Sequence, residues 1–172
     1  MPPEAQAVDL MQAALRTLAT NDRVNAYLVE HLSDELWASD VPGARKTVRA
    51  LAAHIHNVRC MWVKMLGRKL GVAVPPRLDR AVATRKETIA AFAVSHRAMS
   101  RLLELGLSKG KLPGFPPDAM HFLGYVLAHD AHHRGQLCMI ARELGHRLPV
   151  SVAAGLWQWS ARAKEASGQS RK

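Results

Sequence analysis

The stretch DAMHFLGYVLAHDAHHRGQLCMIARELG, residues 118–145, decides the fold class of this chain. Its apolar and histidine positions recur every three or four residues, which predicts one long helix with a single inward face. That face comprises Phe122, Val126, His129, His133, Gln136 and Ile140. Asp118 suits the start of the helix, because its carboxylate can accept backbone N–H groups of the first turn, and Gly145 suits the end.

The rest of the chain repeats this periodicity, so we expect an all-α fold, a four-helix bundle with an additional C-terminal helix. The pattern predicts helices over residues 5–32, with a break near Thr20-Asn21-Asp22, and over 44–66, 84–105, 118–144 and 151–166. Residues 67–80 are rich in Gly and Pro and are expected to form a loop. Thr84 and Glu87 have the spacing of a capping box, and Trp157 is expected to pack against the bundle. We predict a single domain over 1–166 and a flexible basic tail over 167–172.

The composition is that of one globular domain, with 172 residues of which 48% are hydrophobic and 22% charged. No apolar run approaches the roughly 18 residues of a membrane-spanning helix, and acidic residues near the N-terminus are unlike a secretory signal. Two cysteines, Cys60 and Cys138, are too few for a disulfide framework. We therefore expect a cytoplasmic protein that does not engage a membrane.

The net charge of +10 raises the question of a nucleic-acid partner. The Lys and Arg residues are spread along the chain, with no long basic block and no interleaved aromatic residues. This pattern is more typical of a solvated basic surface than of a nucleic-acid platform.

Periodicity sorts the histidines into candidates for a metal site. His129 and His133 lie one helical turn apart on the inward face, a spacing at which two imidazoles can bind one divalent ion. In the helix over 44–66, His54 shares a seam with Leu51, Val58, Met61 and Met65, whereas His56 shares a flank with Arg49, Ala52, Arg59 and Val63. We therefore expect His54 to point inward and His56 outward. A metal on one ring nitrogen and a hydrogen bond on the other would offset the cost of burying such a histidine.

The spacing leaves alternatives open. His132 competes with His133 as a partner for His129 but lies off the main seam, and His96, on the face of the helix over 84–105, is a rival third ligand. All of these histidines are also compatible with neutral, hydrogen-bonded core positions. Three inward histidines from two helices favour the metal site.

The segments AHIHNVRCMW, residues 53–62, and HDAHHRGQ, residues 129–136, together resemble the DinB/YfiT-like superfamily. The likeness spans nearly the whole chain and is carried by HxxxHRGQ together with a histidine eight positions before Trp62. The resemblance implies a bundle in up-down-down-up order, a homodimer, and His54, His129 and His133 as ligands of a divalent metal ion, with zinc and nickel both reported. It also implies chemistry on a small-molecule substrate with a low-molecular-weight thiol such as mycothiol, bacillithiol or glutathione.

These observations lead to two hypotheses about function. The first is a metal-dependent enzyme, a thiol transferase or a hydrolase, because three protein ligands leave room on the metal for a thiol or water. The second is a non-catalytic, metal-stabilised bundle that binds a partner such as nucleic acid. The sequence indicates no general base.

Four further side chains are candidates for a role near the site. Gln136 could orient a histidine through a hydrogen bond. Asp130 could form a surface ion pair or accept the N–H of a neighbouring histidine. Asn25 and Ser95 could line a substrate pocket, although polar bonding inside the bundle would explain them equally well.

Overall fold

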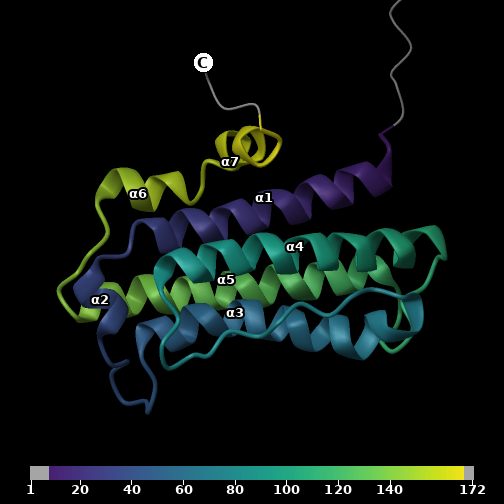
Figure 1. Cartoon of the computed structure of the whole chain (residues 1–172). Helices are drawn as coiled ribbons and strands as arrows, with labels where there is room; N and C mark the ends of the chain where they lie inside the picture. The colour runs from purple at the N-terminus through teal and green to yellow at the C-terminus, as the bar shows by residue number, and fades with distance from the viewer. Residues whose placement is uncertain (1–7, 169–172) are drawn as a thin grey trace, which may run out of the picture.

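The computed structural model describes residues 8–168, and every regular element in that range is helical (Figure 1). In chain order the helices are α1 Leu10–Glu30, α2 Asp34–Ala38, α3 Val48–Trp62, α4 Arg85–Ser108, α5 Ala119–Glu143, α6 Val150–Gly155 and α7 Trp159–Ala166. A π-helical turn, η1 Val63–Gly67, and a 3-10 turn, η2 Arg68–Leu70, follow α3 directly. The all-α prediction is confirmed. Within the described range, no helix has both the length and the apolar character needed to cross a membrane.

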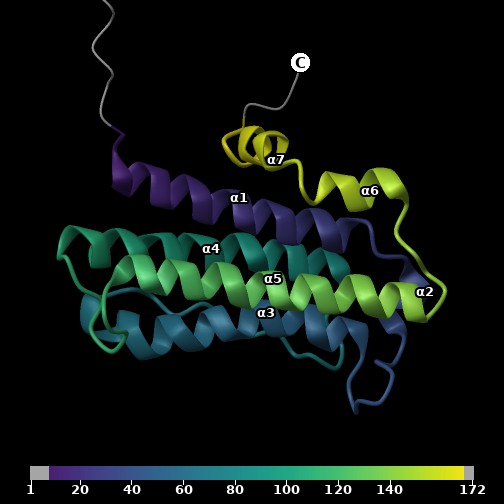
Figure 2. The ribbon, with the colours of Figure 1, turned by 180° about the vertical axis from the view of Figure 1, so that it is seen from behind.

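Four long helices, α1, α3, α4 and α5, lie side by side, and α6 and α7 lie along the outer side of α1 (Figures 1 and 2). Buried apolar side chains form two clusters, one including Leu28, Leu51, Phe92 and Ile140 and the other including Leu18, Met99, Leu103 and Phe122. Between these clusters, α1 contributes the buried Asn21 and Asn25, and α5 contributes the buried Asp130 and His133. The middle of the bundle therefore holds a polar layer between two apolar ones.

Side-chain caps begin the helices where the sequence predicts them. Thr84 Oγ1 accepts the backbone N–H of Glu87 at 3.1 Å while the Thr84 N–H donates to Glu87 Oε2 at 2.8 Å, which is the predicted capping box. Asp118 accepts the N–H groups of Met120 and His121 at 2.8 and 3.0 Å at the start of α5. Gly145 follows the end of α5 with a φ of 79°, in the left-handed region that favours glycine.

Helix α1 differs from the prediction because it runs without a break from Leu10 to Glu30. The polar residues that suggested a break find hydrogen-bond partners either in α1 itself or across the bundle. Thr20 Oγ1 donates to the carbonyl of Arg16 at 2.8 Å, and Asn21 Nδ2 donates to Asp130 Oδ2 at 2.7 Å across the bundle. Residues 5–7 of the predicted helix lie outside the described residues.

The C-terminal segment forms two helices rather than the single helix predicted over 151–166. Trp157 is 83% exposed, so the prediction that it packs against the bundle is wrong. The C-terminal helices instead contact Tyr27 of α1 through Gly155 and Arg162. A Cβ on Gly155 would lie 2.3 Å from the Tyr27 hydroxyl, and the Arg162 guanidinium lies 4.0 Å from the centre of the Tyr27 ring. Of the predicted basic tail, residues 169–172 lie outside the described residues.

The segment between η2 and α4 runs back along α3 without regular structure (Figure 1). It is held there by polar side chains of α3. His56 Nε2 lies 2.8 Å from the carbonyl oxygen of Pro76, and Asn57 both donates to the Leu78 carbonyl at 3.0 Å and accepts its N–H at 2.9 Å. Helix α3 itself begins at Val48, four residues later than the sequence predicts.

Candidate metal centre

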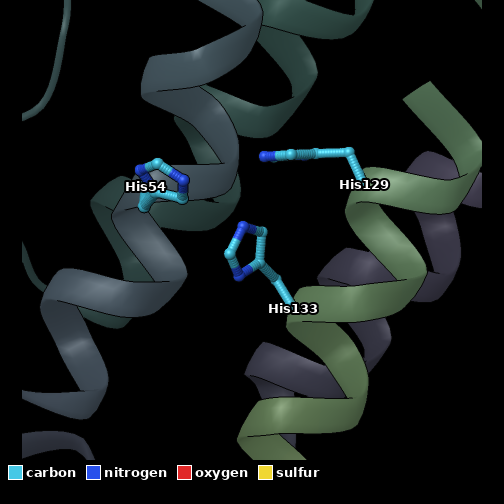
Figure 3. A group of neighbouring side chains, drawn as sticks. All are labelled: His54, His129 and His133. Carbon is cyan, nitrogen blue, oxygen red and sulfur yellow. The ribbon is translucent and has the colours of Figure 1, made fainter. Parts of the chain in front are cut away.

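Three histidines meet between α3 and α5, and their imidazole rings point toward one another (Figure 3). His54 comes from α3, and His129 and His133 come from α5. Each offers one ring nitrogen, and these atoms all lie within 4.8 Å of one another. Ring centroids are 4.5 Å apart for His129 and His133, 4.7 Å for His54 and His133, and 5.6 Å for His54 and His129. The structure thus brings together the three nominated residues, and metal binding by them stays a prediction.

The two α5 histidines each have an oxygen partner on one ring nitrogen. Nδ1 of His129 lies 3.2 Å from Asp130 Oδ1, and Nδ1 of His133 lies 2.8 Å from Gln136 Oε1. Carboxylate and amide oxygens only accept hydrogen bonds, so each Nδ1 carries the hydrogen and donates it. In the neutral form of each ring the lone pair is therefore on Nε2, the nitrogen that remains for a metal. Gln136 lies where the sequence predicts an orienting partner.

The environment keeps two of these imidazoles, those of His54 and His133, uncharged. Burial, followed by the nearby rings of His133 and His129, lowers the pKa of His54 from 6.5 to about 4. Burial also lowers the pKa of His133, although its hydrogen bond to Gln136 opposes the shift. Both side chains are consequently neutral at pH 7, the form in which histidine binds a metal ion.

Asp130 is fully buried, so the predicted surface ion pair is wrong and the predicted contact with a neighbouring histidine is the one present. Its Oδ2 accepts hydrogen bonds from Asn21 at 2.7 Å, Asn25 at 2.8 Å and the Arg59 guanidinium at 2.7 Å. Burial alone would raise the pKa of Asp130. The charge of Arg59 and the hydrogen bonds from His129, Arg59 and Asn25 outweigh burial and hold that pKa well below its usual range.

The buried face of α3 is not the predicted one. His56 and Arg59, which the periodicity places on an outward flank, are 1% and 2% exposed. Met61 and Met65, placed on the inward seam with His54, are exposed instead. The reason is tertiary, because the two buried polar side chains find hydrogen-bond partners in the connection before α4 and in α1 and α5. His54 lies at the border between the two faces and is half-buried.

The remaining candidates do not belong to the group of three ring nitrogens. Asn25 and Ser95 are buried and bond within the bundle, so neither lines an open pocket. His96, the rival third ligand, lies 3.4 Å from Ser100 Oγ and does not join the histidine cluster. His132 is exposed.

An aromatic cluster flanks the histidines on one side. The ring of Tyr125 stacks on that of His129 with centroids 6.1 Å apart. Tyr125, Trp62, Phe115 and Phe122 contact one another with centroid separations from 5.0 to 5.7 Å. Because Tyr125 is 37% exposed, this apolar wall reaches the surface beside the histidines.

Comparison with known families gives a match to the family described as DinB family, which covers residues 8–165. The chain belongs to the DinB family. The resemblance based on the two histidine segments is therefore confirmed. No similar curated protein and no similar solved structure was found.

Several polar residues of this DinB family protein escaped the sequence analysis. The sequence pattern placed Arg59 on an outward flank and did not single out Arg134, yet Arg134 Nη1 donates to the amide oxygens of Asn21 and Asn25 at 2.8 and 2.5 Å. A signal was present in the sequence. Asn21 and Asn25 lie one turn apart on α1, and Asp130 and Arg134 repeat that spacing on α5, so complementary polar pairs face each other.

Proposed function

We propose that this DinB family protein is an enzyme that depends on a divalent metal ion held by His54, His129 and His133. The observation that carries the proposal is the pattern of hydrogen bonds on α5. Nδ1 of both His129 and His133 donates a hydrogen bond to a side-chain oxygen, so the lone pair on Nε2 of each ring remains for a metal. Imidazole nitrogens suit zinc, nickel and other first-row divalent ions, so the donor set does not select one of them.

Three protein ligands are typical of catalytic zinc sites, whereas structural sites have four. A metal bound in this way supplies a position at which water or a thiol becomes a nucleophile at neutral pH. The chain's own residues provide orientation: Asp130 and Gln136 fix the rings of His129 and His133, and the aromatic cluster offers an apolar surface beside them. Asp130 does not serve as the general base, because both of its oxygens are engaged.

Within this proposal, transfer of a low-molecular-weight thiol to a small-molecule electrophile is favoured over hydrolysis. The likeness to DinB relatives that use such thiols supports this choice, and so does the apolar wall of Tyr125, Trp62 and Phe115. The up-down-down-up order and a homodimer belong to the same proposal. The connection that returns along α3 before α4 begins supports that order, because it lets α3 and α4 run in the same direction.

The test is an activity screen on protein loaded with Zn²⁺ or Ni²⁺. Mycothiol, bacillithiol and glutathione are each offered with an aromatic chloride, from which sulfur displaces chloride, and an activated ester is offered separately for hydrolysis. We expect turnover that His133→Ala abolishes and that His132→Ala, a change at the exposed neighbouring histidine, leaves in place. Metal-loaded protein that shows no turnover but binds nucleic acid in a salt-sensitive way would instead favour the non-catalytic reading.

A further inference from the structure

Buried charges lie beside the metal centre without contributing to it directly. Asp130 and Arg59 are 0% and 2% exposed, and Arg59 bridges Asp130 on α5 and Asp22 on α1. Removing charged groups from water is costly, and apolar residues of similar volume commonly stabilise a fold as well or better. The position of these charges in the middle of the bundle therefore calls for a reason other than stability.

The hydrogen bonds around Asp130 permit one arrangement of two asparagine amides. A carboxylate is only an acceptor and a guanidinium is only a donor. Asn21 and Asn25 lie between Asp130 and Arg134, and each directs its NH₂ group to Asp130 and its carbonyl oxygen to Arg134. Turning either amide over would place donor against donor at one end and acceptor against acceptor at the other. Helix α1 therefore holds the carboxylate in a single orientation.

The second oxygen of that carboxylate faces the metal centre. Three donors, from Asn21, Asn25 and Arg59, hold Oδ2, which leaves Oδ1 to accept the Nδ1–H of His129 at 3.2 Å. A carboxylate placed behind a histidine ligand selects the tautomer of the ring and makes the opposite nitrogen a better donor to metal.

We infer that Arg59, Asn21, Asn25 and Arg134 are positioning residues: they hold Asp130 so that the hydrogen of His129 stays on Nδ1, and thereby set the affinity of the site for metal. This inference rests on the proposed function. It assigns a role in metal binding to Arg59 of α3 and to α1, which supplies no ligand.

The test compares metal affinity in the purified full-length protein, measured by competition with a chelator, with the visible absorption of bound Co²⁺ as a second readout. In Asp130→Asn, Asn21, Asn25 and Arg59 still donate hydrogen bonds to the one remaining side-chain oxygen. The new NH₂ group therefore faces His129 Nδ1. The ring must then carry its hydrogen on Nε2, the nitrogen needed for metal. Asp130→Ala leaves the ring free to choose either tautomer.

We therefore expect metal affinity to fall in the order parent, Asp130→Ala, Asp130→Asn, with the Asn variant weaker than the parent by about 10- to 100-fold. Folding stability should instead fall in the order parent, Asp130→Asn, Asp130→Ala, because asparagine preserves more of the buried hydrogen bonds than alanine does. A purely structural role for Asp130 would give the same order in both measurements, which would overturn the inference.

Two further variants complete the comparison. Asp22→Asn is the matched control, because it removes the other carboxylate bound to Arg59 but does not touch His129, and its metal affinity should equal that of the parent. Arg59→Lys keeps the charge but loses the planar guanidinium that bonds Asp22 and Asp130 at once. The metal affinity of this variant should therefore be lower than that of the parent. Unchanged affinity in Arg59→Lys, or a loss in Asp22→Asn as large as in Asp130→Asn, contradicts the inference.

The outcomes separate the two proposals. A parent that binds metal through the three histidines, with Asp130→Asn binding equally well, overturns the positioning role and leaves the proposed function intact. A parent that binds no added Zn²⁺, Ni²⁺ or Co²⁺ overturns both.

If Asp130→Asn does not fold, Asn25→Ala provides the test, because it removes one of the three donors with every charge in place. Its control is Asn57→Ala, which deletes a buried amide bonded to Leu78. Asn25→Ala should bind metal less tightly than Asn57→Ala. Equal affinities in this pair overturn the inference.

Discussion

Gln136 is placed to orient His133, a proposed metal ligand, without touching the metal. Its Oε1 accepts the Nδ1–H of His133 at 2.8 Å. Gln136→Leu removes the acceptor and frees the ring to rotate or change tautomer, so we expect metal affinity to fall by about 10-fold. Gln136→Glu retains an acceptor oxygen and should retain the affinity. Isothermal titration of the metal-free protein with Zn²⁺ measures both, and equal affinity in the Leu variant and the parent would contradict this role.

His96 is expected to make stability depend on pH. Burial is the main cause that lowers its pKa from 6.5, while Asp22 and Arg59 act in opposite directions. The unfolded chain takes up a proton as the pH falls through 6.5, whereas the folded protein resists it. The stabilising contribution is therefore complete above pH 6.5 and is lost below it.

The corresponding variant is His96→Gln, which does not titrate. Its free energy of unfolding, measured with urea on metal-free protein, should fall less steeply than that of the parent between about pH 7 and pH 5. Parallel curves for the two proteins would show that His96 does not titrate with the shift described.

Residues whose relation is local were predictable from the sequence, and those whose relation is tertiary were not. His129 and His133 share one helix, so their spacing alone fixes their distance. His54 was correctly grouped with them, but the burial of His56 and Arg59 depends on partners that arrive from other parts of the chain. A period of 3.6 residues reports which residues share a face and does not report what that face meets.

At the scale of the element, α6 is attached to α1 through a very close approach. A Cβ on Gly155 would lie 2.3 Å from the Tyr27 hydroxyl and 2.7 Å from the ring carbon that carries it. Gly155→Ala must therefore push α6 away from α1 or displace Tyr27 from the Arg162 guanidinium. We expect a lower melting temperature and faster hydrogen exchange in α6 and α7 than in the parent.

Gly124→Ala is the control for that variant. Gly124 lies within α5, and a Cβ there would meet nothing within 4 Å. Alanine should stabilise the helix at this position by roughly 0.5–1 kcal/mol, because glycine loses more backbone freedom on folding. Destabilisation by both substitutions would show that the contact with Tyr27 is not what distinguishes the two sites.

Elements were predicted well where their signals are local. The capping box at Thr84 and the cap at Asp118 each lie within one turn, and both are present. The continuity of α1 was missed because Asn21 is satisfied by Asp130, a residue far away in the sequence. The division into α6 and α7 was missed for a similar reason, since the contact of Gly155 with Tyr27 is tertiary.

At the scale of the whole molecule, the proposed metal would join α3 to α5 in the polar layer between the two apolar clusters. An ion that binds the folded chain and not the unfolded one stabilises the fold by mass action. Zn²⁺ at about 1,000 times its dissociation constant should add roughly 4 kcal/mol, read as a rise in melting temperature. His133→Ala should show no such rise, and an equal rise in that variant would place the metal elsewhere.

The most direct test of the three-histidine centre is the metal content of the purified protein, prepared without an affinity tag and measured by elemental analysis beside His54→Ala, His133→Ala and His132→Ala. We predict close to one divalent ion per chain in the parent and in His132→Ala, and little metal in the other two variants. A parent that is free of metal and takes up neither Zn²⁺ nor Ni²⁺, or a His133→Ala variant with full occupancy, would contradict the assignment.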